Sequence, residues 1–360
     1  MRTFFRKSLL LFGVLCIAMS ASAQVPMFGF VIPVVAKSPG ALGTDWATDV
    51  WISNIGTADR EFSAHFFRSG QANTFNGNFS KTGILVRKGR TVQAIDVIGT
   101  WFPGEGSSVK GWILIADTTP VDCDDDNRTA AKAIVATRLY NKIGDGSSFG
   151  QIFESSLLAI NSSPFPSNFT AIRNRAKTTK PGARTNVGVA NISTSAITVE
   201  IRLIKSGGAV AGTVERSIPA LSHNQWSLTD LGFPAFGAAA GRLEVQLKNG
   251  FQLFDPCENT TTTGLCLDRC DSNCGGKYGF GPIPAFVPYV SNIDNDTGDG
   301  EVILPILDQL GYGEWEEEYI DTHCPDKSGD SVFVHAYRQI QPFFESQERP
   351  VPPVFRKVVK

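Results

Sequence analysis

The amino-acid sequence predicts an all-β protein built from two tandem β-sandwich domains, with a cysteine-rich insertion in the second. Short segments of alternating apolar and polar residues are separated by Gly, Pro, Asn and Ser, and the chain contains 35 Gly and 20 Pro residues. The same series of segments occurs twice, and long amphipathic helical patterns are missing. Alternation with a period of two is typical of strands that bury one face, and many short strands with turn signals favour sandwiches.

The N-terminus has the pattern of a secretory signal peptide over residues 1–23. Arg2, Arg6 and Lys7 precede the apolar run Leu9–Met19, and the small residues Ala21–Ala23 then provide a cleavage site before Gln24. A membrane anchor would need about 20 apolar residues, which is more than this run supplies. We therefore expect an exported protein without a transmembrane segment after cleavage, located at the cell surface or outside the cell, with the periplasm as the alternative destination.

The charge balance bears on the class of partner. The chain has 33 Lys and Arg against 35 Asp and Glu, for a formal net charge of −2. Residues 1–23 carry three positive charges and no acidic residue, so their removal changes the net charge to −5. This balance gives no electrostatic reason to expect a nucleic-acid or anionic-membrane partner.

An internal repeat defines the domain organisation. Residues 48–56 (TDVWISNIG) match residues 185–193 (TNVGVANIS) 137 positions later. At the same offset, the alternating pattern around Phe62 recurs around Val199. Both copies therefore predict the same consecutive strands.

Later segments match at changing offsets, as loop insertions and deletions would produce. Residues 92–96 correspond to residues 226–230 at an offset of 134 positions, and residues 111–115 correspond to residues 241–245 at an offset of 130. Residues 139–141 correspond to residues 293–295 at an offset of 154. The linker-like segment 162–167 separates the copies. We expect a first domain over residues 24–165, a second over 166–310 with an insertion at about 255–280, and a C-terminal extension over 311–360.

The TDVWISNIG segment, together with the later Leu139–Asn141 segment and an Asp-Gly hairpin, resembles duplicated segments of poorly characterised exported bacterial proteins. The resemblance covers residues from about 30 to 308. It implies that each copy is an immunoglobulin-like sandwich, and it transfers no active-site residue.

Six cysteines remain after signal cleavage, and four of them lie in the insertion. An even number in an oxidising compartment favours disulfides, although four clustered thiolates could instead bind zinc. The insertion has little apolar sequence of its own, so we expect cross-links to stabilise it. The six residues are Cys123, Cys257, Cys266, Cys270, Cys274 and Cys324.

Two acidic loops are candidates for calcium, because carboxylate oxygens are its preferred ligands. One contains Asp124, Asp125 and Asp126, and the other contains Asp294, Asp296 and Asp299. Neither fits the EF-hand pattern. The alternative is that the second loop is only an Asp-Gly hairpin turn, since the first copy keeps a single acidic residue there. No other cofactor is expected.

The sequence contains no local catalytic signature. No Gly-x-Ser-x-Gly elbow, His-Glu-x-x-His motif or phosphate-binding loop occurs, and His223 falls in a predicted turn. Trp46 and Trp101 lie beside turn-like residues, where exposed rings could stack on sugars. Ordinary packing is the alternative for both.

We therefore expect a non-catalytic structural, adhesive or scaffold protein that could self-assemble. Strand addition through residues 28–35 is one route to assembly, although these residues could equally form the first strand of their own domain. The alternatives are a carbohydrate-binding protein and, less favoured, a secreted hydrolase.

Overall fold

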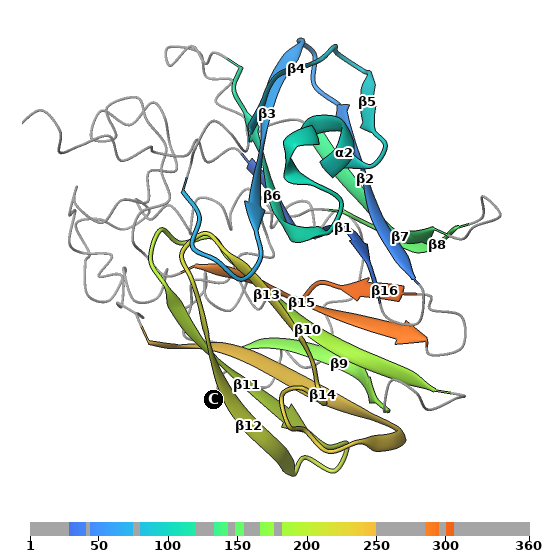
Figure 1. Cartoon of the computed structure of the whole chain (residues 1–360), viewed down its shortest axis with the longest axis vertical. Helices are drawn as coiled ribbons and strands as arrows, with labels where there is room; N and C mark the ends of the chain where they lie inside the picture. Colours follow the sequence, from blue (N-terminus) through green and yellow to red (C-terminus); the bar gives the residue numbers. More distant parts are fainter. Residues whose placement is uncertain are drawn as a thin grey trace, which may run out of the picture.

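The computed structural model describes residues 29–40, 44–74, 80–119, 133–142, 148–154, 166–175, 182–249, 285–294 and 300–305. These residues form antiparallel sheets with one short helix and one 3-10 turn, so the predicted all-β class is confirmed. No helix among them is long and apolar enough to cross a membrane. We call strands β1–β8 the N-terminal unit and β9–β16 the C-terminal unit. Figure 1 shows the first unit above the second.

The N-terminal unit contains two sets of four strands. Sheet A has the order β4 (Ser80–Val86), β3 (Arg60–Arg68), β6 (Val109–Asp117) and β1 (Gly29–Pro39). Sheet B has the order β5 (Thr91–Ala94), β2 (Asp45–Asn54), β7 (Ala133–Lys142) and β8 (Ser148–Glu154). Helix α2 (Val97–Trp101) and the 3-10 turn η3 (Pro103–Glu105) follow β5.

Strand β1 joins the two sheets. Its first part pairs with β6, and its last residues, Ser38 and Pro39, pair with β2. The register with β6 shifts between Ile32 and Val35. Pro33 lies in this shift, where its missing N–H does not interrupt a regular ladder. Residues Gly29–Ile32 and Val35 pair with β6 of their own unit, in agreement with the alternative that residues 28–35 form the first strand of their own domain. Strand addition through these residues stays a prediction.

The C-terminal unit repeats this strand order. Sheet C has the order β13 (His223–Ser227), β10 (Ala183–Asn191), β15 (Phe286–Asp294) and β16 (Gly300–Ile303). Sheet D has the order β12 (Val210–Ile218), β11 (Ile197–Ile204), β14 (Phe236–Asn249) and β9 (Ser167–Asn174). Sheet D thus corresponds to sheet A, and sheet C corresponds to sheet B.

Cross-strand partners give the correspondence residue by residue. Ala64 pairs with Ile115, and Ile201 pairs with Val245, in agreement with offsets of 137 and 130. On the other sheet of each unit, Asp49 pairs with Arg138 and Asn186 pairs with Ser291. The offset at β7 and β15 is therefore 153, and the expected 154 is wrong by one residue. A slip of one residue would exchange the two faces of the strand.

Cross-strand partners also change the alignment of β5 with β13. Val50 pairs with Ala94, whereas Val187 pairs with Trp226. The offset there is 132, not the expected 134. Both errors lie beyond loops that differ in length between the copies, where sequence alone does not fix the register.

Apolar side chains at alternate positions fill the space between the sheets of each unit, which gives a β-sandwich-like arrangement. The N-terminal core includes Phe62, Phe66 and Ile113 from sheet A with Val50 and Ile52 from sheet B. The corresponding core of the C-terminal unit is formed by Val187, Val189, Val199, Ile201, Leu203, Leu243, Val245 and Val290, among others. Full burial of each such side chain stabilises the fold by about 1.5–3 kcal/mol.

A third apolar cluster joins the two units. From the outer face of sheet A and adjoining β1 it includes Val31, Phe67, Trp112 and Leu114. From the C-terminal unit it includes Ala190, Ile192, Leu221, Ala285 and Val287. Phe67 and Trp112 stack with ring centroids 4.1 Å apart. The outer face of sheet C therefore packs against the N-terminal unit.

Candidate functional site

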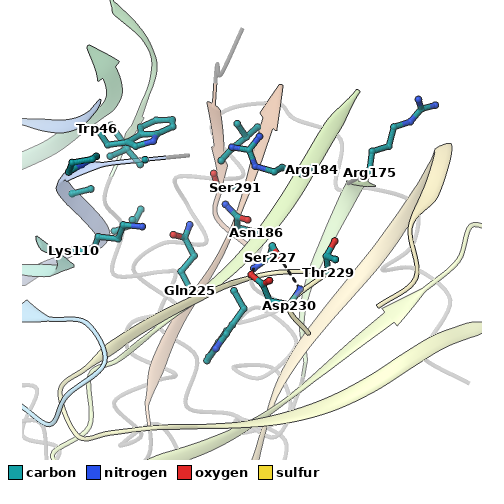
Figure 2. A pocket seen from close by; sticks show the side chains of 17 residues that line it. Trp46, Lys110, Arg175, Arg184, Asn186, Gln225, Ser227, Thr229, Asp230 and Ser291 are labelled. Carbon is teal, nitrogen blue, oxygen red and sulfur yellow. Dashed lines mark hydrogen bonds between the residues drawn. The ribbon is translucent and has the colours of Figure 1, made fainter. Parts of the chain in front are cut away.

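A cleft of about 600 Å³ opens beside this junction. Figure 2 shows Trp46 and Lys110 on one side, with Asn186, Gln225 and Arg184 across from them. The N-terminal unit contributes residues of β1, β2, β6 and β7. The C-terminal unit contributes residues of β10, β13 and β15, with Arg175 from the position after β9 and Thr229 and Asp230 from the turn after β13. The cleft is thus formed by both units.

The C-terminal wall is a continuation of the outer face of sheet C. On β10, the core residues Val187 and Val189 alternate with Arg184, Asn186 and Gly188 on the outer face. From the end of β10 towards its start, the residues on this face change from apolar to polar. Ala190 is packed in the junction, whereas Asn186 and Arg184 line the cleft. Amide and guanidinium groups placed in this way can donate hydrogen bonds to a polar ligand.

The N-terminal wall has an aromatic ring near its edge. Trp46 is half-buried, and its indole N–H donates to Thr44 Oγ1 at 3.1 Å. The adjacent backbone N–H of Asp45 donates to Asn141 Oδ1 at 2.7 Å. These bonds hold the start of β2, so the ring of Trp46 is positioned on the cleft wall before any ligand arrives.

Positive charge predominates among the residues that line the cleft. Lys110, Arg175 and Arg184 contribute cations, and Asp230 is the lining carboxylate. Asp230 belongs to the turn after β13, where its backbone N–H donates to Ser227 Oγ at 3.0 Å. Burial lowers the pKa of Arg184, but an arginine stays protonated at neutral pH. The lining therefore favours ligands rich in hydroxyl or anionic oxygen.

Three hydrogen-bonded polar side chains lie in the junction, of which Ser69 is half-buried and the other two are buried. Ser69 Oγ is 2.6 Å from His223 Nδ1, and His223 Nε2 is 2.7 Å from the hydroxyl of Tyr289. His223 and Tyr289 are fully buried, and their rings are nearly parallel. Gly188 makes room for Tyr289, because a Cβ at this position would come within 2.1 Å of the tyrosine ring.

Ser69 and His223 have the composition of a nucleophile–base pair, but the basicity of the imidazole is low. Burial lowers the pKa of His223 to about 3, so the imidazole is a weak base at neutral pH. Both of its nitrogens are engaged within the protein, and its ring is 1% exposed. Ser69, His223 and Tyr289 thus form a hydrogen-bonded connection between the two units.

Backbone hydrogen bonds strengthen the same junction. Gly70 N–H donates to His223 O and Asn73 N–H to Ala220 O, each at 3.0 Å. The side-chain amide of Asn73 and the indole of Trp112 both donate to Leu221 O, at 2.8 and 3.2 Å. The loop after β3 is therefore hydrogen-bonded to the segment before β13, and the two units form a continuous structure there.

The structure separates the two tryptophans that the sequence singled out. Trp46 lines the cleft, whereas Trp101 is 8% exposed and belongs to the core of the N-terminal unit. Trp101 ends helix α2, whose other buried residues, Val97 and Ile98, face the same core. A glycan platform that includes Trp101 is thus excluded by its burial, and the packing alternative holds for this residue.

Several expected features lie outside the described residues. These are the signal peptide 1–23, the insertion 255–280, the extension 311–360, all six cysteines, Asp124, Asp125, Asp126, Asp296 and Asp299. Asp294 is described and ends β15, where it pairs with Ala183. The described part of the chain contains no group of three or more His, Cys, Asp or Glu arranged to hold a metal. The disulfide and calcium expectations stay predictions.

Sequence reasoning missed the buried role of His223, which begins β13 instead of lying in a turn. A signal for the junction was nevertheless present. Residues 112–116 of β6 are five consecutive apolar residues, whereas residues 242–247 of β14 alternate. A continuous apolar run indicates a strand buried on both faces. The difference between copies marks the sheet that the other unit covers.

Comparisons with known proteins give no family. No family model matches the chain, and no curated protein sequence matches it. A chain from the T=13 particle of infectious bursal disease virus is 11% identical, with 90% of this chain and 88% of that chain covered, at a TM-score of 0.14. A chain of the VP2 subviral particle of that virus is 12% identical, with 90% of this chain and 91% of that chain covered, at a TM-score of 0.15. Likeness at this level indicates neither fold nor function.

Proposed function

We propose that the protein is a non-catalytic exported scaffold or adhesive component made of two tandem immunoglobulin-like sandwich domains. The repeated strand order and the matching cross-strand partners support the tandem interpretation. The signal-peptide pattern and the resemblance of residues 30–308 to duplicated exported bacterial proteins support export. Scaffold proteins need a fixed shape more than a reactive centre.

The observation that carries this proposal is the junction between the units. Trp112 and Leu114 are almost fully buried there, and His223 is hydrogen-bonded to both units. Domains joined only by a linker usually move relative to each other, whereas a large apolar interface fixes them. A fixed pair of sandwiches transmits force and holds its two ends at a constant separation.

Three measurements test the proposal. N-terminal sequencing of protein recovered from outside the producing cell should begin at Gln24, and small-angle scattering should fit a single arrangement of the units. The purified protein should show no turnover of glycans, esters or peptides. Turnover that is lost in Ser69→Ala would contradict the non-catalytic assignment, because it would make the Ser69–His223 pair reactive.

The cleft favours glycan binding as a second candidate function. Trp46 supplies a ring on which a sugar can stack, and Asn186, Gln225 and Ser291 line the cleft with polar groups. Protein–sugar recognition commonly combines such a ring with hydrogen bonds from amide side chains. An adhesive role and a glycan ligand are compatible.

A glycan array with wild-type protein, Trp46→Ala and Leu85→Ala tests this candidate. Leu85 is 53% exposed on β4 and does not line the cleft, so the second variant controls for loss of an exposed apolar side chain elsewhere. We expect Trp46→Ala to weaken binding at least tenfold and Leu85→Ala to leave it unchanged. Absence of any glycan signal, or equal loss in both variants, would count against a sugar site in the cleft.

A further inference from the structure

The repeat makes one surface of the N-terminal unit directly comparable with a surface that is already covered. The outer face of sheet B corresponds to the outer face of sheet C, which packs against the N-terminal unit. At the registers above, Trp51 and Ala136 of sheet B correspond to Gly188 and Tyr289 of sheet C. Each pair places one large ring beside one small residue. In sheet B the ring is on β2, whereas in sheet C it is on β15, the counterpart of β7.

Two further positions follow the same correspondence. Ile134 corresponds to Val287 and Ile152 corresponds to Val302. Val287 is fully buried in the junction, and Val302 is 7% exposed and packs against the N-terminal core. In contrast, Ile134 is 42% exposed and Ile152 is 61% exposed. Sheet B therefore keeps apolar residues at positions that are covered in sheet C.

The two exposed isoleucines lie close to the half-buried residues Trp51 and Ala136 on the sheet. Trp51 is directly opposite Ala136, Ile134 is two residues before Ala136 on β7, and Ile152 is opposite Arg138. We call Trp51, Ile134, Ala136 and Ile152 the sheet B patch. Large exposed apolar residues are unremarkable when scattered, but a contiguous group on one sheet face is typical of an interaction site.

The charges beside the patch do not oppose association with an identical surface. Arg138 is directly opposite Asp49 on the neighbouring strand, and its guanidinium carbon lies 4.8 Å from the ring centroid of Tyr140. The carboxylate of Asp49 accepts hydrogen bonds from the Tyr140 hydroxyl and the Asp96 backbone N–H. Asp49 is buried beside Arg138 on the same face, so its carboxylate offsets part of the arginine charge that two such faces would bring together.

Among the residues that the structure describes, the other sheet faces fit less well as partners for this patch. The sheet that covers sheet C within the molecule is sheet A, whose outer face is already occupied by the junction. Its counterpart, sheet D, carries Glu200, Arg202 and Glu244 on its outer face, linked by ion pairs. Covering this charged face with the sheet B patch would desolvate the ion pairs, at a cost of several kcal/mol per ion. Head-to-tail addition of chains is therefore disfavoured.

We propose that the outer face of sheet B is the interface of a homodimer, in which the sheet B patches of two chains pack against each other around a two-fold axis. An isologous contact of this kind uses the same surface on both chains and closes at two. The inference extends the proposed scaffold role by giving its assembly a definite size. It uses no feature of the cleft.

The experiment uses the mature chain, starting at Gln24, in sedimentation velocity over a wide range of concentrations. We expect a monomer–dimer equilibrium without larger species. Ile152→Glu should raise the dissociation constant at least tenfold, because it places a charge in each half of the interface. Leu85→Glu is the matched control, since Leu85 is 53% exposed on β4 of sheet A and lies outside the patch. It should leave the dimer unchanged.

Hydrogen exchange at low and high concentration locates the contact and keeps the test independent of one variant. Protection should increase with concentration in peptides from β7 and β8 and should stay constant in those from β11 and β14. A monomer at all concentrations, a dimer that tolerates Ile152→Glu, or protection on sheet D would overturn the proposal. None of these results would affect the scaffold assignment, which depends on export and lack of turnover.

Discussion

The outer faces of sheets A and D occupy the same place in the repeat but have opposite chemistry. Trp112 and Leu114 on sheet A correspond to Arg242 and Glu244 on sheet D. The first two residues are 0% and 1% exposed in the junction, whereas the side chain of Arg242 is 51% exposed and pairs with Glu244 at 2.7 Å. One strand framework thus supports either an apolar contact or a solvated charged surface, and the outward residues alone decide which.

The largest expected effect on stability comes from replacing Leu114 of sheet A with the residue type found at the corresponding position of sheet D. Leu114→Glu would bury an unpaired carboxylate between the units and should lower the free energy of unfolding by about 4 kcal/mol or more. The reciprocal change Glu244→Leu should cost about 1 kcal/mol or less, because the arginines it leaves behind are exposed. Urea denaturation of both variants measures the contrast. Similar midpoints for the two variants would contradict it.

The second effect is a pH dependence that originates in the junction. Burial lowers the pKa of His223 from 6.5 to about 3, so between these values the unfolded chain binds a proton that the folded chain does not. The contribution of neutral His223 is therefore complete above pH 6.5 and is lost as the pH falls towards 3, by up to about 1.4 kcal/mol per pH unit. Denaturation midpoints at pH 7, 5.5 and 4 measure this slope. The free energy of unfolding of His223→Gln should fall less steeply with decreasing pH than that of the wild type.

A smaller effect is expected from His223→Gln at pH 7. The substitution shortens the bridge between Ser69 and Tyr289 and leaves at least one buried hydroxyl without its present partner. An unsatisfied buried group costs about 1–3 kcal/mol. Thermal unfolding at neutral pH gives the value. His65→Gln is the control for loss of an imidazole, because His65 is only half-buried and its ring is 3.0 Å from Ser63 Oγ on its own strand. A larger loss in the control would argue against the bridge.

The smallest effect should come from the charged face of sheet D. Lys248 is 3.0 Å from Glu200 and 3.3 Å from Glu215, and its side chain is 48% exposed. Such surface pairs contribute about 0–1 kcal/mol and are weakened by salt. Lys248→Met should therefore change the urea midpoint very little in 0.5 M salt. A large loss of stability there would mean that sheet D also packs against another surface.

The sequence was sufficient for the fold class and for much of the core, because period-two alternation places residues such as Phe62 and Val199 on the inner faces of their strands. It was also sufficient for Trp46 as a candidate at an exposed edge. It was insufficient for the cleft, because Trp46 and Asn186 come together only through the packing of two distant segments. His223 illustrates the same limit, since its partner Ser69 lies 154 positions away. No local pattern encodes such a contact.

The hydrogen bonds from Gly70 and Asn73 to the segment before β13 also bear on how the protein could have evolved. Two duplicated modules that kept independent surfaces could be deleted, shuffled or inserted elsewhere as units. In this chain the N-terminal unit alone would expose Phe67, Trp112 and Leu114 to water, together with backbone groups that now have partners. Each unit thus depends on the other to cover these groups, so a change that removed one unit would also destabilise the other.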